Sequence, residues 1–369
     1  MYCSTRRVRC AAILTGWLVS AALPPAASGQ SVERIAIDSV VAVDESAGPN
    51  ISHRPQVVLD FSVGVRLSDH WQAYFRPWFR LPRPSSSTAP TPEWDKEIYQ
   101  AGLRYERPGT VATRIDAGYI LSPIGLGMFD ARPGINPTIF PHLSYLAPLP
   151  TFDSSGPRVS AVAASYPLGA QLTVSSTRWD ARAAVVNSAP VRLYAVGAVT
   201  NPVQTPVFVT GGGITPRTGV RLGVSAAHGL YATSAEITRP SSAGRAMTMV
   251  GGEGELAFGY TKIAGEVMRT SFDTSTDAAI AYEWFVQATQ TLTPRWFIAG
   301  REEGTSAPPL TTGGVAGSRT SQHIGEATAG FRVSPQVTLR SSYFARRVYG
   351  GTTWDKQAAV SVVWSRRWW

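Results

Sequence analysis

The 369-residue chain has little cysteine, little charge and no long apolar run after its first 30 residues. Its two cysteines, Cys3 and Cys10, both lie in the first ten residues, which excludes a disulfide scaffold or a cysteine zinc site in the rest of the chain. Charged residues make up 16% of the chain, whereas ordinary soluble domains contain about 25%. Beyond residue 30 no apolar stretch is long enough to predict a spanning helix.

Lysine is also scarce, because the formal charge of +9 comes from 31 arginines and only three lysines. A basic chain raises the question of a nucleic-acid partner. These arginines are scattered along the sequence and form no basic cluster. We therefore expect no nucleic acid as a partner.

The N-terminus has the order of a secretory signal peptide. Arg6, Arg7 and Arg9 precede the apolar segment 10–23, and small residues follow as far as Gly29. The sequence predicts removal of residues 1–29 and export of a single domain, residues 30–369. That domain would contain no cysteine and would carry a net charge of +6, because three arginines are lost from +9.

The rest of the chain shows apolar residues at every second position, the pattern of a β-strand with one apolar and one polar face. One run has Val57, Leu59, Phe61, Val63, Val65 and Leu67 on a single face. A second run places Glu97, Tyr99, Ala101, Leu103 and Tyr105 together. The sequence predicts an all-β fold.

Breaks between these runs fall into two classes, and the classes alternate along the chain. Tight turns are predicted at 67–70, 107–110, 167–169, 188–190, 228–229, 259–261, 292–294 and 333–335. Longer polar connections are predicted at 81–95, 122–157, 200–216, 239–247, 271–279, 304–321 and 347–355, with 179–181 as a short exception. Short turns at one end and long loops at the other are typical of transmembrane antiparallel β-barrels. The count favours 18 strands, with 16 as the alternative.

Aromatic residues gather beside the predicted tight turns, as in the interfacial girdle of such barrels. Trp71, Tyr105 and Trp296 are examples. The chain ends in Trp368-Trp369 after a predicted strand, which resembles the signal that outer-membrane barrels present to their assembly machinery.

A barrel of 16 to 18 strands cannot fill its interior with strand side chains and encloses an aqueous channel unless a plug occupies it. Arginine facing lipid costs about 2–4 kcal/mol at the midplane, so the lumen is the expected side for charged residues. The predicted lumen-lining residues are Arg66, Arg76, Arg104, Arg114, Asp116, Arg221, Arg340 and Arg346. Either these arginines form a ladder that favours anions, or they pair with carboxylates across the wall and only keep the lumen wet.

The longest predicted connection, 122–157, is rich in apolar and aromatic residues and is unsuited to a loop exposed to water. We expect it to fold into the lumen and narrow the channel. Candidate constriction residues are Asp130, Arg132, His142 and Asp153. The alternative is an outward cap or a contact between subunits.

One segment carries a more specific resemblance: a strand that ends at Gly118 and Tyr119 and runs through Ser122-Pro123-Ile124-Gly125 into the long loop. The chain resembles the porin superfamily of Gram-negative outer membranes and is most similar to phosphate-selective porin-like proteins. This resemblance implies a barrel in outer-membrane lipid, often a homotrimer, that passes small hydrophilic or anionic solutes. Phosphate selectivity in that family relies on lysines and arginines, and with three lysines we expect general diffusion. The C-terminal strand would engage the barrel assembly machinery.

The sequence contains few features that would indicate an enzyme. The five histidines are spread along the chain, and neither a G-x-S-x-G nor an H-E-x-x-H motif occurs. We expect no catalytic residues, no cofactor and no metal. The alternatives to a porin are an adhesin or structural barrel with a closed lumen, an outer-membrane barrel hydrolase, and a soluble all-β protein.

Overall fold

The computed structural model describes residues 34–368 except 50, 82–92, 127–131, 143–144, 146, 154–155, 163–166, 193–204, 238–242, 276–277, 310, 313–314 and 317. The predicted signal peptide lies outside the described residues, as does Asp130. Residues 34–369 form one unit of structure. Within its described part, no helix is long and apolar enough to cross a membrane.

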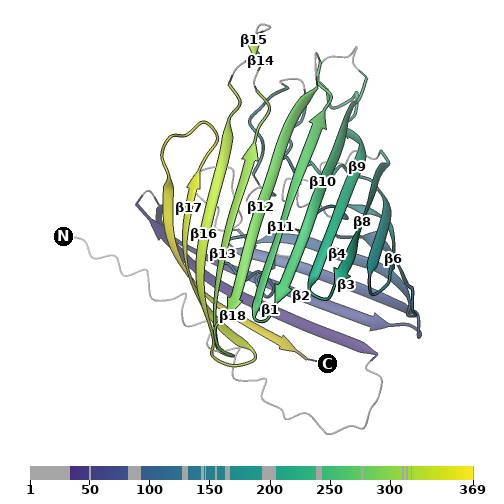
Figure 1. Ribbon diagram of the computed structural model, residues 1–369, viewed down its shortest axis with the longest axis vertical. Helices are drawn as coiled ribbons and strands as arrows, with labels where there is room; N and C mark the ends of the chain where they lie inside the picture. Colours follow the sequence, from purple (N-terminus) through teal and green to yellow (C-terminus); the bar gives the residue numbers. More distant parts are fainter. Residues whose placement is uncertain are drawn as a thin grey trace, which may run out of the picture. The chain divides into compact units, whose positions relative to one another are not determined.

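Sixteen antiparallel strands close into a barrel, as shown in Figure 1. They are β1 (Ile35–Gly48), β2 (Ile51–Arg66), β3 (Trp71–Leu81), β4 (Asp95–Arg107), β5 (Ala112–Tyr119), β6 (Leu168–Ser175), β7 (Trp179–Val186), β8 (Val207–Arg217), β9 (Val220–Ala232), β10 (Arg245–Phe258), β11 (Thr261–Phe272), β12 (Ala279–Thr291), β13 (Trp296–Ser306), β16 (Ser321–Arg332), β17 (Val337–Arg347) and β18 (Asp355–Arg367). Each strand pairs with its neighbours in sequence, and β1 pairs with β18 to close the barrel. The short strands β14 (Thr311–Thr312) and β15 (Val315–Ala316) form a separate hairpin.

The predicted all-β barrel is confirmed, with 16 strands rather than the favoured 18. Turns predicted at 167–169, 188–190 and 228–229 are wrong: Leu168 begins β6, and 228–229 lies inside β9. The missed turns are 176–178 and 218–219. Segments 158–162 and 189–192 form only an isolated bridge between Val159 and Arg192. The apolar residues of these two segments pack in a buried cluster. Alternation of apolar residues alone does not distinguish such a segment from a strand of the wall.

The asymmetry between the two ends follows from the strand limits. Turns of two to four residues join β2 to β3, β4 to β5, β6 to β7, β8 to β9, β10 to β11, β12 to β13 and β16 to β17. At the other end the connections are longer, apart from 49–50 between β1 and β2. Beside the turns, Trp71 packs on Tyr105 with ring centroids 5.3 Å apart, and Trp296 packs on Phe331 at 4.7 Å.

The wall alternates between an apolar outer face and a more polar inner face. On β9, for example, Leu222 and Val224 are 54% and 65% exposed on the outside, while Ser225 is buried on the inside. A register shift where β3 pairs with β4 leaves Tyr99 as an extra residue. This bulge reverses the alternation, so Tyr99 is buried while Leu103 is 45% exposed. The single face predicted for residues 97–105 is therefore wrong.

Candidate functional site

The connection from β5 to β6, residues 120–167, turns into the barrel directly after β5. Gly118 lies so close to β4 that a Cβ would stand 2.3 Å from the Ala101 carbonyl oxygen. Gly125 has a φ of +73°, and its missing side chain leaves room for the Tyr145 hydroxyl and the Glu266 carboxylate. The Leu126 N–H and the Tyr145 hydroxyl both donate to Glu266 of β11. The segment that carries the family resemblance is thus the point where the chain turns inward.

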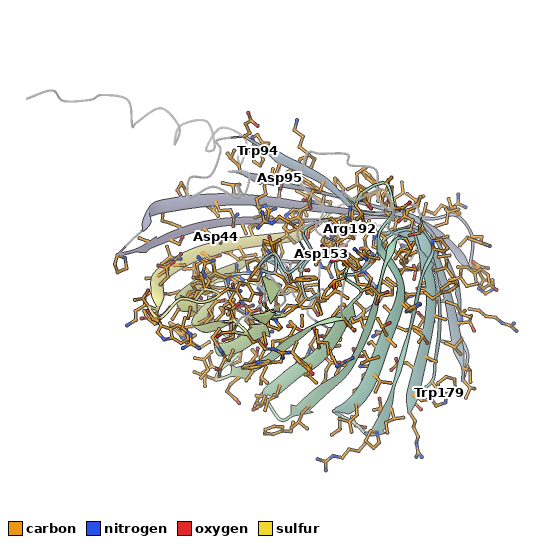
Figure 2. The ribbon with its side chains drawn as sticks, turned by 90° about the horizontal axis from the view of Figure 1, so that it is seen from above. Asp44, Trp94, Asp95, Asp153, Trp179 and Arg192 are labelled. Atoms are coloured by element: carbon orange, nitrogen blue, oxygen red, sulfur yellow. The ribbon has the colours of Figure 1, made fainter. Side chains whose placement is uncertain are left out.

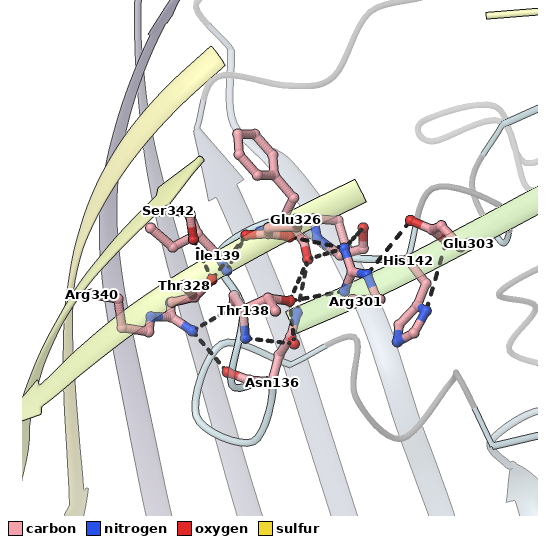
Figure 3. Close-up of polar contacts among 12 residues, drawn as sticks. Asn136, Thr138, Ile139, His142, Arg301, Glu303, Glu326, Thr328, Arg340 and Ser342 are labelled. Carbon is pink, nitrogen blue, oxygen red and sulfur yellow. Dashed lines mark hydrogen bonds and ion pairs between the residues drawn. The ribbon is translucent and has the colours of Figure 1, made fainter. Parts of the chain in front are cut away.

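Farther along, the connection is bound to β13 and β16, as shown in Figure 3. Glu326 of β16 accepts hydrogen bonds from the backbone N–H groups of Ile139, at 2.8 Å, and Phe140, at 3.2 Å. Arg301 of β13 donates to Thr138 Oγ1 and to the Phe140 carbonyl, each at 2.9 Å, and to Glu326 at 3.1 Å. Charge-assisted bonds of this kind are about twice as strong as neutral ones.

Arg340 of β17 holds the preceding turn. Its guanidinium donates to the carbonyl oxygens of Asn136, at 2.8 Å, and Thr138, at 2.7 Å, and to Ser361 Oγ at 2.9 Å. The Asn136 side chain closes the turn by donating to the Phe140 carbonyl and accepting from the Thr138 N–H. Arg340 therefore faces inward and is 4% exposed beneath the connection.

His142 is buried where the same connection meets the wall. Its Nδ1 is 3.7 Å from Glu303 Oε2, and its ring lies against Phe285 with centroids 4.4 Å apart. Burial lowers the pKa of His142 well below its usual value, and the nearby Arg301 cation lowers it further. His142 is therefore uncharged at neutral pH.

An apolar cluster fixes the rest of the connection to the inner faces of β7–β12. Residues from the connections pack on inward side chains of the wall. Among them are Ile124, Leu149, Val159, Val162, Val191, Val186, Val207, Val209, Met247, Met268 and Phe272. Asp153 lies 3.5 Å from Arg245 of β10. This part of the interior is packed like a protein core.

Paired charges line the inner faces of β2 to β10. Asp60 accepts from Arg76 at 2.7 Å, and Asp116 accepts from Arg104 at the same distance. Arg114 also pairs with Asp116, at 2.9 Å. Farther round the wall, Arg221 bridges Asp180 and Glu253 at 2.9 and 2.7 Å, and Arg182 lies 3.3 Å from Glu253. Figure 2 shows the side chains from above.

Within several of these pairs the arginine is more exposed than the carboxylate. The side chains of Arg104 and Arg114 are 27% and 41% exposed, whereas the Asp116 that they share is 7% exposed. Arg221 and Arg182 likewise share Glu253, whose side chain is fully buried. In each cluster two guanidinium groups share one buried carboxylate, and one of the two arginines also pairs with a second carboxylate, Glu106 for Arg104 and Asp180 for Arg221.

The remaining predicted residues differ in their surroundings. Arg66 is exposed at the turn end of β2 and makes no ion pair within the described part of the chain. Arg346 lies 3.7 Å from Asp355, with both side chains partly exposed. The Arg132 backbone carbonyl accepts from Asn136 at 2.8 Å. Among the described residues, no group of three or more His, Cys, Asp or Glu side chains has the arrangement of a metal site.

Arg301, Glu303, Glu326 and Glu266, which hold or contact the connection, are absent from the predicted set. The signal for Arg301 and Glu303 was present, because both alternate with Ile298, Gly300 and Glu302 along β13. Their partners in the connection are backbone groups, two hydroxyls and the His142 ring, and sequence patterns do not identify such pairings.

No family model matches this sequence, and no curated protein sequence matches it either. Solved structures do resemble the fold. Salmonella typhi OmpF, in a complex with daunomycin, gives a TM-score of 0.61 at 11% identity and covers 90% of this chain and 97% of its own. Vibrio cholerae OmpT, an outer membrane protein, gives 0.57 at 8% identity, with 90% and 97% covered. An anion-selective porin from Comamonas acidovorans gives 0.53 at 8% identity, with 90% and 99% covered. The fold is a closed antiparallel β-barrel like those of these outer-membrane proteins.

Proposed function

We propose that this chain is an outer-membrane porin, a passive diffusion channel for small hydrophilic solutes that is exported by a cleaved signal peptide. The observation that carries the proposal is the connection 120–167, which is bound to β11–β17 by buried charges while charged pairs line the wall from β2 to β10. A connection anchored in this way narrows the channel and stays in place while a solute passes. In this proposal Arg132, His142 and Asp153 belong to the constriction segment, together with Asp130.

Anion preference is the second part of the proposal. The pairing of arginines with carboxylates supports the interpretation that charges keep the lumen wet. The charges of Arg104 and Arg114 are balanced by Asp116 and by Glu106, which lies 3.7 Å from Arg104, but both arginines are more exposed than Asp116. Charges that line a pore set its ion selectivity. Arg340 would act by holding the connection rather than by meeting solutes.

The proposal excludes an enzymatic role and predicts neither a cofactor nor a resident metal. In this proposal the exposed apolar outer face contacts membrane lipid, and the barrel assembly machinery recognises the C-terminal strand.

The test is single-channel conductance of refolded residues 30–369 in a planar bilayer, with the reversal potential measured in a potassium chloride gradient. We expect discrete steps and a reversal potential of anion sign. The double variant Arg104→Ser/Arg114→Ser should move the reversal potential toward cations. The matched control is Arg346→Ser, which removes an inward arginine outside these two clusters. A folded barrel without conductance would favour the closed-lumen adhesin or structural barrel, for which the apolar cluster in the lumen is the supporting observation.

A further inference from the structure

Unpaired arginines gather at the turn end of the barrel, where short turns join the strands. Asp38, Glu106 and Glu255 at this end already pair with other cations. Among the described residues, this leaves Asp69 as the exposed carboxylate of the turn end without an ion pair. Within the same residues, six exposed arginines have neither an ion pair nor a side-chain hydrogen bond: Arg34, Arg66, Arg107, Arg178, Arg217 and Arg295. The turn end therefore carries an excess of positive charge.

The backbone fixes three of these arginines between neighbouring strands. The Arg34 carbonyl accepts from the Arg66 N–H at 2.7 Å, which joins β1 to β2. The Arg178 carbonyl accepts from the N–H of Thr215 on β8 at 2.7 Å, and the Arg295 carbonyl accepts from the N–H of Arg332 on β16 at 2.8 Å. Successive strands are neighbours in the barrel, so the six arginines follow one another round its rim. Their positions are set by the wall, while their side chains remain exposed.

The depth of these arginines in a membrane follows from the aromatic residues beside them. Arg178 directly precedes Trp179, and Arg295 directly precedes Trp296. These tryptophans are 41% and 49% exposed on the outside of the barrel. Tryptophan and tyrosine in such belts lie at the level of the lipid head groups. In the membrane location of the proposed function, the neighbouring guanidinium groups therefore reach the level of the lipid phosphates.

We propose that the arginine rim, defined by the six exposed arginines named above, binds the phosphate groups of anionic phospholipids in the leaflet at the turn end. The guanidinium group binds phosphate through two parallel hydrogen bonds. A zwitterionic lipid brings its own cation and cannot offset the excess charge, whereas an anionic lipid can. Each arginine near an anionic membrane surface strengthens the attraction about fivefold. The inference rests on the membrane location in the proposed function but not on conductance.

The arrangement of the rim favours lipids over one soluble polyanion as the occupant. The six arginines belong to different turns or strand ends round the barrel, so a single soluble ligand would have to span the channel mouth to reach them all. Separate lipid head groups reach each arginine from the side. The loop end differs, because the cations of Arg319 and Arg347 there lie over the rings of Tyr282 and Trp354, at 5.5 and 5.6 Å.

The experiment measures lipid binding to full-length protein that has been exported, extracted in mild detergent and freed of bound lipid. Native mass spectrometry gives the affinities for phosphatidylglycerol and phosphatidylcholine with the same acyl chains, and heat-modifiability shows that the barrel is folded. We expect wild type to bind phosphatidylglycerol about tenfold more tightly, since one head group meets one or two arginines at about fivefold each. The preference should fall below about threefold in the variant Arg107→Gln/Arg178→Gln/Arg217→Gln/Arg295→Gln.

The matched control removes four charges from the loop end instead and should keep the preference: Lys96→Gln/Arg319→Gln/Arg347→Gln/Lys356→Gln. Equal loss in the two variants would assign the preference to net charge and overturn the arginine rim. A second measurement needs no variant, because salt screens exposed charges. The preference of wild type should fall as the salt rises from about 50 mM to about 500 mM, and a constant preference would contradict the inference.

Equal affinity of wild type for the two lipids would also overturn the inference. If that protein bound inorganic polyphosphate and the turn-end variant did not, the arginine rim would be assigned to a soluble polyanion. Conductance recorded on the same samples tests the porin proposal separately. A barrel that conducts without lipid preference would leave the porin proposal standing and remove the arginine rim, whereas a lipid preference without conductance would do the opposite.

Discussion

At the residue scale, the inward connection depends on a few charged groups of the wall. Glu326 accepts two backbone N–H groups, the Arg301 guanidinium and, at 3.5 Å, the Thr328 hydroxyl, so one carboxylate binds four donors. A buried carboxylate with several donors is favourable only as long as all of its partners remain.

Glu326→Gln keeps the size of this side chain and removes its charge. Because hydrogen bonds to charged groups contribute about 1.5–3 kcal/mol each, we expect the variant to loosen the connection at Ile139 and Phe140. Limited proteolysis of the folded barrel should then cleave the connection faster than in wild type. Glu106→Gln, a carboxylate whose side chain is 54% exposed near a turn, is the matched control. Equal cleavage rates for wild type and Glu326→Gln would contradict the anchoring role.

His142 gives the connection a pH dependence of known sign. Its pKa is lowered in the packed state, so packing favours the neutral ring. The stabilisation is present above the ordinary histidine pKa of about 6.5 and is lost as the pH falls through it, by up to about 1.4 kcal/mol per pH unit. Glu303 and Arg301 are the charged groups beside the ring.

Acidification from pH 8 to pH 5 should therefore increase cleavage of the connection and gating noise in single-channel records. In His142→Gln the step near pH 6.5 should disappear. His228→Gln, which changes the exposed histidine that contacts Thr248, should keep it. A step that persists in His142→Gln would assign the effect to other groups.

At the scale of elements, prediction succeeded where one rule decided the structure. Alternation placed most of the strands, and the tight turns at 67–70, 259–261, 292–294 and 333–335 were found within a residue. It failed at the turns predicted at 167–169, 188–190 and 228–229, and in segments 158–162 and 189–192, whose apolar side chains face a buried cluster instead of the outer face. The lumen-lining role of the arginines stays a prediction, and the carboxylates that pair with them depend on register across strands, which a single sequence does not show.

Deleting residues 128–150 tests what the connection does as an element. The deletion removes the groups bound by Glu326, Arg301 and Arg340, so we expect a higher single-channel conductance from a barrel that is less stable, since those side chains lose their partners. Trimming 311–316 from another connection is the control and should leave conductance unchanged. Unchanged conductance in the folded 128–150 deletion would remove the constriction proposal.

At the scale of the whole molecule, closure depends on the pairing of β1 with β18. Trp368 donates from Nε1 to Ser39 Oγ at 2.7 Å and from its backbone N–H to the Ile37 carbonyl at 2.8 Å. Its ring also meets that of Trp364 edge to face, with centroids 5.9 Å apart. Trp368 is therefore a residue of the seam between β1 and β18.

Trp368→Ala should weaken closure, because it removes a hydrogen bond and an aromatic contact together. We expect slower appearance of the heat-modifiable form during refolding, and a lower melting temperature. Trp354→Ala, which changes a 45% exposed tryptophan in the connection before β18, is the matched control. If Trp368→Ala refolded at the wild-type rate, the contacts of Trp368 at the seam would not contribute to the closure of the barrel.

The seam also sets the order in which the strands can complete their pairing. Ser39 and Trp368 are 329 positions apart, so the first strand has no second neighbour until the last strand arrives. Until then two strand edges stay open, and open edges pair readily with other chains. In the proposed outer-membrane location, a precursor delivered from its N-terminus onward has these edges open until β18 follows. Under that proposal the cell has to keep it from aggregating for the whole interval between the export of β1 and the delivery of β18.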